Sequence, residues 1–233
     1  NKGQEDEAIH YQAEFNTHTI YLDKEGFSVL LHDEGKWSEI VSDFHDDKLH
    51  KHDSHSSKGP LSLNYQYIKY KFVGADLSLH TGTKTTSEYY NFFIGNDKSK
   101  WAGGVKKHTK VLFVNIYPNI DLEFETIDER FKYNFILKPG ADIKDILVSI
   151  QGADDIRVTD DRVYVDTRFG EYSEVMPISY EVDGGVSTQI KMKYVKRGEF
   201  IGFETPFFKN KVKTVLNPEV IFATYSGSSV DNF

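Results

Sequence analysis

The sequence predicts an all-β protein built mainly from antiparallel sheets in a sandwich-like arrangement, with one short helix. Segments of alternating polar and apolar residues recur from end to end, as in strands with one buried and one exposed face. Gly, Asn, Asp and Pro separate these segments, and they are the residues that favour turns. The composition is typical of a globular protein and is rich in aromatic residues, with 17 Phe and 14 Tyr but only 2 Met.

The N-terminal part combines a hairpin, a helix and a loop. Strands are predicted at residues 19–22 and 27–31, on either side of a turn at 24–26. A short amphipathic helix follows Gly35, and its apolar positions at helical spacing are Trp37, Ile40, Val41 and Phe44. Residues 46–59 are rich in His, Asp, Lys and Ser, which predicts an exposed, mobile loop. The next strand carries on one face Leu61, Leu63, Tyr65 and Tyr67.

The rest of the chain reads as a meander of hairpins. The clearest strand ends at the turn residues 139–140 and carries on one face Phe131, Tyr133, Phe135 and Leu137. Further apolar faces are formed by Ile146, Val148 and Ile150, by Val163 and Val165, by Ile178, Tyr180 and Val182, and by Ile190, Met192 and Tyr194. Short helical turns are expected at residues 97–101 and 142–145.

Three regions are expected along the chain. Residues 1–60 form an N-terminal β segment with the helix and the loop, residues 61–216 form the main β domain, and residues 217–233 begin a downstream repeat region. The loop at 46–59 is the best internal boundary. Two packed β subdomains and one continuous sandwich both fit this pattern.

Charge and composition exclude several classes of function. The formal net charge of −8 disfavours nucleic-acid binding, which depends on clustered Lys and Arg. The absence of cysteine excludes disulfides, a thiolate nucleophile and a Cys-ligated zinc site. No apolar run approaches the length of a membrane span, so we expect none in this chain. The first residue is Asn rather than Met, which fits removal of a leader and secretion.

The loop and the residue before it hold the densest group of candidate metal ligands, namely His45, His50, His52 and His55, together with neighbouring aspartates. Imidazole and carboxylate suit zinc or nickel. The spacing does not place two ligands on one helix face, and loose loops organise ligands poorly. We therefore favour a solvated loop over a metal site, and expect no cofactor.

Acidic residues supply the other candidates for chemistry. Asp121, Glu123 and Glu125 lie on one strand face, where paired carboxylates suit glycoside hydrolysis. Such alternation is commoner on a solvent-facing strand. The aspartate pairs at 154–155 and 160–161 lack the ordered spacing of a calcium loop and are interpreted as turn residues. We expect no catalytic residues.

Aromatic residues gather in the middle of the chain, where a sugar-stacking surface is one interpretation and core packing is the other. The candidate ligand-facing residues are Tyr89, Tyr90, Phe92 and Trp101, with Phe93 beside them.

Several phrases occur in an order and at intervals that make them more specific together than singly. They are 1–4 (NKGQ), 91–101 (NFFIGNDKSKW), 117–122 (YPNIDL), 138–142 (KPGAD), 152–154 (GAD), 217–218 (NP) and 223–233 (ATYSGSSVDNF). Together they resemble the N-terminal region of SBBP-type β-propeller-repeat proteins, many of which are surface proteins of gliding bacteria exported by the type IX secretion system. The resemblance implies a secreted, cell-surface location and roles in adhesion or gliding motility.

The first expectation for function is therefore a non-catalytic structural or interaction module at the N-terminus of a secreted surface protein. Its expected partners are type IX secretion components or outer-membrane surface proteins. A carbohydrate-binding module of an adhesin is the second interpretation. An enzyme, either a glycoside hydrolase that uses Asp121, Glu123 and Glu125 or a metal-dependent enzyme that uses the histidine loop, is the third.

Overall fold

The computed structural model of the chain describes residues 6–15, 17–33, 36, 63–93, 95–98, 101–127, 130–176, 178–206, 208–209 and 211–221. The predicted helix at 37–44, the loop at 46–59 and the candidate ligands His45, His50, His52 and His55 lie outside these residues. In the described part of the chain, no helix is long and apolar enough to cross a membrane.

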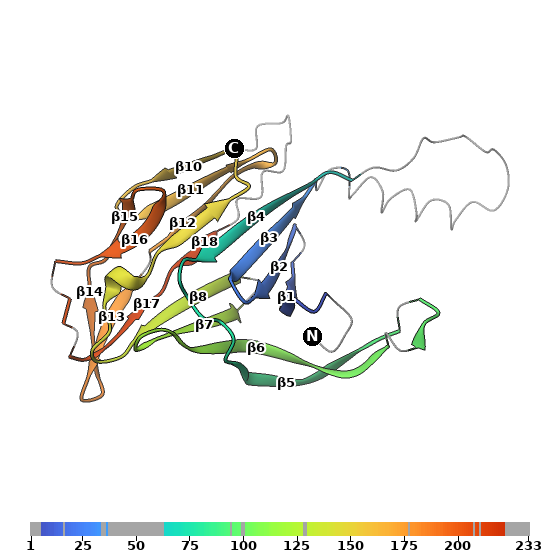
Figure 1. Cartoon of the computed structure of the whole chain (residues 1–233), viewed down its shortest axis with the longest axis horizontal. Coiled ribbons are helices and arrows are strands. Elements are labelled where there is room, and N and C mark those ends of the chain that lie inside the picture. The colour runs from blue at the N-terminus through green and yellow to red at the C-terminus, as the bar shows by residue number, and fades with distance from the viewer. Residues whose placement is uncertain are drawn as a thin grey trace, which may run out of the picture.

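The protein is all-β, as predicted, and two large antiparallel sheets form a sandwich (Figure 1). The strands are β1 (Ile9–Glu14), β2 (His18–Asp23), β3 (Gly26–His32), β4 (Tyr65–Phe72), β5 (His80–Phe92), β6 (Ala102–Tyr117), β7 (Ile120–Ile127), β8 (Arg130–Leu137), β9 (Val148–Gln151), β10 (Asp155–Val158), β11 (Arg162–Thr167), β12 (Gly170–Val175), β13 (Ser179–Asp183), β14 (Val186–Ile190), β15 (Lys193–Arg197), β16 (Phe200–Glu204), β17 (Lys213–Leu216) and β18 (Glu219–Ile221).

Among the described residues, the first sheet has seven strands in the order β1-β2-β3-β4-β9-β16-β15. β3 pairs with β4 along its whole length, from Gly26 opposite Lys71 to His32 opposite Tyr65. The first sheet therefore joins strands that lie before and after residue 60 in the sequence.

The second sheet has eleven described strands and divides at β8. One edge of β8 pairs with β7, and through it with β6 and β5. The other edge is shared by β17, which leads to β13 and β14, and β18, which leads to β12, β11 and β10. Pro218 lies between β17 and β18, where the chain leaves one branch for the other and a residue without a backbone N–H can be accommodated.

Aromatic side chains fill the space between the two sheets. Phe27 and Phe72 come from the first sheet and contact the β8 side chains of the second, with Phe27 and Phe131 ring centres 5.1 Å apart and Phe72 and Phe135 5.4 Å apart. The predicted apolar face of β8 is confirmed, because the buried residues are Phe131, Tyr133, Phe135 and Leu137. This interior is the rigid part of the molecule on which any surface site is mounted.

Two strands use the opposite phase from the one suggested by their aromatic or aliphatic residues. In β4 the face that carries Tyr65 and Tyr67 is half exposed, and the buried face carries Gln66, Ile68, Tyr70 and Phe72. The longer apolar run after Tyr67 sets the phase, and tyrosine tolerates exposure because its hydroxyl is polar. In β13 the buried residues are Ser179 and Glu181, while Ile178 before the strand is exposed.

The predicted helical turn at residues 142–145 is confirmed as the short 3-10 helix η2 (Ile143–Asp145). Asp142 caps it, because its carboxylate accepts a hydrogen bond of 2.9 Å from the backbone N–H of Lys144. Aspartates also shape the predicted turns near β10. Asp161 accepts a bond of 3.0 Å from the Thr159 hydroxyl, and Asp154 accepts one of 3.2 Å from the Gln66 amide.

Candidate binding surface

The most prominent surface feature is a two-stranded arm formed by parts of β5 and β6 and defined here as residues 83–93, 95–98 and 101–109. β6 pairs with β7 from Lys110 onwards, so in the described residues the preceding part of β6 pairs only with β5. The arm consequently extends past the ends of the neighbouring strands (Figure 1). Most of its side chains are exposed on both faces.

The side chains of the arm are more available for contact with a partner than the backbone groups along its edge. Register shifts interrupt the β5–β6 ladder at several places between Gly82 and Phe92. Irregularities of this kind twist an edge strand and hinder the addition of another strand. Near the tip, Asn91 fastens the two strands, because its side-chain oxygen accepts a 2.9 Å hydrogen bond from the backbone N–H of Gly104.

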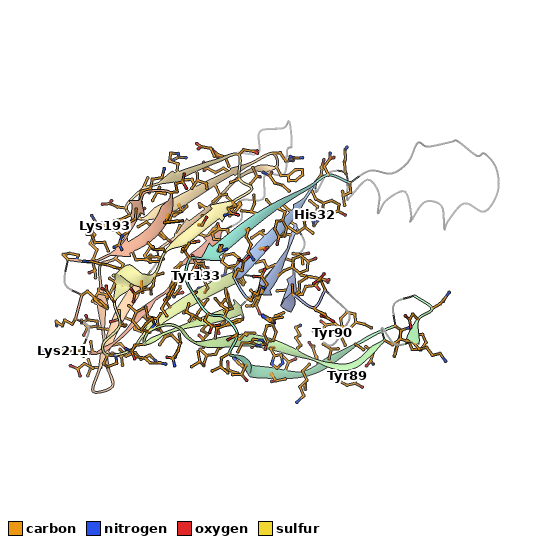
Figure 2. All side chains as sticks on the ribbon, in the orientation of Figure 1. His32, Tyr89, Tyr90, Tyr133, Lys193 and Lys211 are labelled. Carbon is orange, nitrogen blue, oxygen red and sulfur yellow. The ribbon has the colours of Figure 1, made fainter. Side chains whose placement is uncertain are left out.

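The sequence-predicted aromatic residues all lie on this arm, and Figure 2 labels Tyr89 and Tyr90 there. Tyr89 is 64% exposed, Tyr90 50% and Trp101 38%, whereas Phe92 is half-buried. Phe93, which lies between the strands at the tip, is 64% exposed. Tyr89 and Tyr90 are adjacent in β5, so strand alternation directs them to opposite faces of the arm.

The rings near the tip are fixed by mutual contacts but are not coplanar. Phe93 and Trp101 meet edge to face, with ring centres 5.2 Å apart and planes 72° apart. Tyr90 and Phe92 are 6.1 Å apart and inclined by 38°. The indole N–H of Trp101 donates a 3.3 Å hydrogen bond to the Gly95 carbonyl. Phe93 and Trp101 are therefore in contact with each other even though both rings are exposed.

The arm is basic in an acidic protein. Its 24 residues contain four lysines and two acidic residues, a net charge of +2, although the whole chain has 28 basic and 36 acidic residues. The other residues consequently carry a net charge of −10. Glu88 pairs with Lys107 at 3.1 Å, but in the described part of the chain no carboxylate lies within ion-pair distance of Lys84, Lys98 or Lys106.

A cluster of rings at the base fixes the arm to β1 of the first sheet. The ring centres of His10 and His80 are 4.4 Å apart, and the Tyr11 hydroxyl lies 3.2 Å from Nδ1 of His80. Tyr11 also contacts the His108 ring edge to face. Gly82 leaves room for this ring, because a Cβ there would lie 2.1 Å from Nδ1 of His108 unless the ring moved.

Burial, more than any neighbouring charge, lowers the pKa of these three imidazoles from the ordinary value of 6.5. They are therefore mostly neutral at pH 7, which allows His10 and His80 to stay in contact without charge repulsion. Sequence analysis missed this base cluster. His10, His80 and His108 are far apart in the sequence, and only the pairing of β5 with β6 and the approach of β1 bring them together.

The acidic residues of β7 that were candidates for glycoside hydrolysis form ion pairs with lysines. Asp121 pairs with Lys138 at 2.7 Å, and Lys110 bridges Glu123 at 3.2 Å and Glu125 at 3.0 Å. These carboxylates lie on the face of β7 opposite its core side chains, where cross-strand neighbours leave Asp121 buried and Glu123 and Glu125 half-buried. Each carboxylate therefore contributes to an ion pair within the sheet. In the described residues, no group of three or more histidines or carboxylates is placed to hold a metal ion.

The interior holds a second group that sequence analysis missed, centred on Glu174 of β12. The Tyr194 hydroxyl donates a 2.7 Å hydrogen bond to Oε1 of Glu174. The Tyr133 hydroxyl faces the same carboxyl without completing a hydrogen bond of normal geometry. Burial raises the pKa of Glu174 to about 7, and the two hydroxyls offset part of that increase.

Two more tyrosines complete this interior group. The Tyr70 hydroxyl, from the first sheet, donates a 3.2 Å hydrogen bond to the Tyr172 hydroxyl in the second. Burial raises the pKa of both phenols far enough to keep them neutral. A sequence signal was available, because Glu174 shares the core-facing phase of Tyr172. It did not, however, reveal which tyrosines would surround the carboxyl.

Fold and surface together define an all-β sandwich domain with a projecting, aromatic and basic arm. The chain belongs to the family described as a domain of unknown function (DUF7948), which it matches over residues 1–219. A search of curated proteins and a search of solved structures found no match to the chain.

Proposed function

We propose that this domain is a non-catalytic interaction module of a secreted cell-surface protein and that the arm makes the contact. The observation that carries the proposal is the set of exposed rings on a two-stranded arm that extends past the neighbouring strands. Exposed Tyr and Trp side chains commonly dominate binding energy at interfaces, because each buries a large area with few rotatable bonds.

The sandwich serves as the mount of the arm. An isolated two-stranded hairpin is marginally stable in water, so the arm needs a fixed base. Two features fix the base of the arm. One is the base cluster of His10, Tyr11, His80 and His108, and the other is the continuation of β6 into the part of the sheet where it pairs with β7. A rigid mount lowers the ordering cost of binding.

The proposed context is the bacterial cell surface. The resemblance of seven phrases along the chain to SBBP-type repeat proteins favours export by the type IX secretion system and a role in adhesion or gliding motility. The proposed partners are then secretion components or outer-membrane surface proteins. Binding to such a partner requires a surface that is exposed and held in place by the rest of the domain. The arm is exposed, and its base is held by the sandwich.

Capture of envelope components by the tagged parent protein tests this function. The arm variant carries Tyr89→Ser, Tyr90→Ser and Trp101→Ser, and the matched control carries Tyr65→Ser, which removes an equally exposed tyrosine from β4. We expect the wild type and the control to retain the same components and the arm variant to lose them. Retention by all three proteins would contradict the proposal.

A glycan array run with the same proteins separates the second candidate function. Binding to defined sugars that disappears in the arm variant would make the domain a carbohydrate-binding module. An array without signal, combined with arm-dependent capture of proteins, is the result we expect.

A further inference from the structure

The charge of the arm limits the chemical class of its partner. The arm carries four lysines in 24 residues and no arginine, and its net charge of +2 contrasts with −10 in the other residues. A body of negative charge with one positive projection is oriented by any extended anionic surface, which attracts the arm and repels the remainder. The first requirement on a partner is therefore negative charge spread over an area.

Three exposed rings of the arm each have a lysine beside them. Tyr89 lies directly across the ladder from Lys106, and Lys107 lies close enough to Tyr90 for the two to interact. The ammonium group of Lys98 lies 5.7 Å from the centre of the Trp101 ring. Both faces and the tip thus combine an aromatic ring with a cation.

Ring geometry distinguishes between anionic partners. A sugar chain is best bound by flat, exposed ring faces, but the tip rings meet at 72° and the Tyr90 and Phe92 rings at 38°. Phosphodiester recognition in nucleic acids typically uses clustered Arg and Lys, and this arm has no arginine. Binding in the interfacial zone of a lipid bilayer requires neither coplanar rings nor the paired N–H donors of an arginine side chain. Tyr and Trp settle there with the ring in the apolar layer and the polar atom at the headgroups.

We infer that the arm docks the domain onto an anionic lipid surface, with lysines at the headgroups and the ring of Trp101, together with Tyr89 or Tyr90 from the face that meets the bilayer, in the interfacial layer. This inference rests on the proposed function, since it names the partner of the same arm. The charges that contribute are Lys84, Lys98 and Lys106, which have no described carboxylate within ion-pair distance. Lys107 contributes less because Glu88 neutralises it.

Vesicle sedimentation tests the inference with the purified domain. The probes are vesicles of phosphatidylcholine containing about 30% phosphatidylglycerol and vesicles of phosphatidylcholine alone. We expect binding to the anionic vesicles only, weakened by added salt because the attraction is screened. The double variant Lys98→Ala and Lys106→Ala should bind about 30-fold more weakly, because each lysine near an anionic surface contributes about one factor of five to six.

The control removes two lysines at the opposite end of the sandwich, Lys193→Ala and Lys211→Ala (Figure 2). It has the same net charge as the arm variant and should bind as the wild type does. Equal weakening of both variants, or equal binding to both kinds of vesicle, would overturn the inference.

Failure of this inference can be told apart from failure of the proposed function. If no vesicle binds but capture of envelope proteins still depends on Tyr89, Tyr90 and Trp101, the arm contacts a protein and the lipid inference is wrong. If neither vesicle binding nor capture depends on the arm, both proposals are wrong.

Discussion

Tyrosine is used in opposite ways in the interior group and on the arm. In the interior, Tyr133 and Tyr194 are fully buried and direct their hydroxyls at the carboxyl of Glu174. On the arm, Tyr89 and Tyr90 are at least half exposed and lie beside lysines. Burial of the first pair stabilises the fold, whereas the second pair leaves apolar area in contact with water. Stability explains the interior tyrosines, and we propose that contact with a partner explains those on the arm.

The largest expected effect compares one phenylalanine from each region. Phe27→Ala removes a fully buried ring that stacks on Tyr70 at 4.3 Å, and it should lower the free energy of unfolding by about 3–5 kcal/mol. Phe93→Ala removes a mostly exposed ring and should lower it by less than about 1 kcal/mol. Urea unfolding of both variants measures the difference. Similar losses would mean that the arm is part of the stabilising core.

The next effect is the pH dependence caused by Glu174. Because its pKa is raised to about 7 in the folded state, its stabilising contribution is complete below the ordinary value of 4.5 and is lost as the pH rises through 7. The loss should be about 3 kcal/mol, since one pKa unit corresponds to about 1.4 kcal/mol. Glu174→Gln should remove most of the decrease in unfolding free energy between about pH 5 and about pH 8.

The control for this measurement is Glu171→Gln, a change on the same strand at a more exposed carboxylate that pairs with Arg157 at 2.9 Å. It should leave the pH dependence nearly as in the wild type, because exposed ion pairs contribute little. An unchanged pH dependence in Glu174→Gln would show that Glu174 is not the group that titrates.

The smallest expected effect concerns the base of the arm. Gly82→Ala forces the His108 ring away from β5, because the added Cβ would lie 2.1 Å from Nδ1. The cost should be about 1 kcal/mol, since a side chain near the surface can move. Loss of burial should raise the pKa of His108 towards 6.5. Titration of the imidazole signals by NMR measures this change. Gly103→Ala is the control, because its Cβ would meet only an ordinary contact of 3.4 Å with Asn91.

Long strands with strict alternation were predictable from the sequence. In β8 the four apolar residues at every second position leave one phase that buries them all. In β4 both phases contain tyrosine, so the sequence does not determine which face is buried until Ile68 and Phe72 are counted together. The hairpin around residues 24–26 was predictable for the same reason as β8, since polar and apolar residues alternate clearly in its two strands.

The candidate surface was predictable only in part. Tyr89, Tyr90 and Trp101 are close in the sequence, so a cluster of rings could be expected from local reading. Projection of the arm could not, because it depends on where β7 stops pairing with β6. The Glu174 group and the base cluster also depend on strands that are distant in the sequence, and no local pattern encodes such pairings.

Site-specific photo-crosslinking in cells that express the parent protein tests the central claim most directly. A photoreactive phenylalanine analogue replaces either Tyr89 on the arm or Tyr65 on β4, two tyrosines that are 64% and 50% exposed. The account predicts adducts with lipid or protein at position 89 and none above background at position 65. Adducts at position 65 with none at position 89 would contradict the claim that the arm is the contact surface.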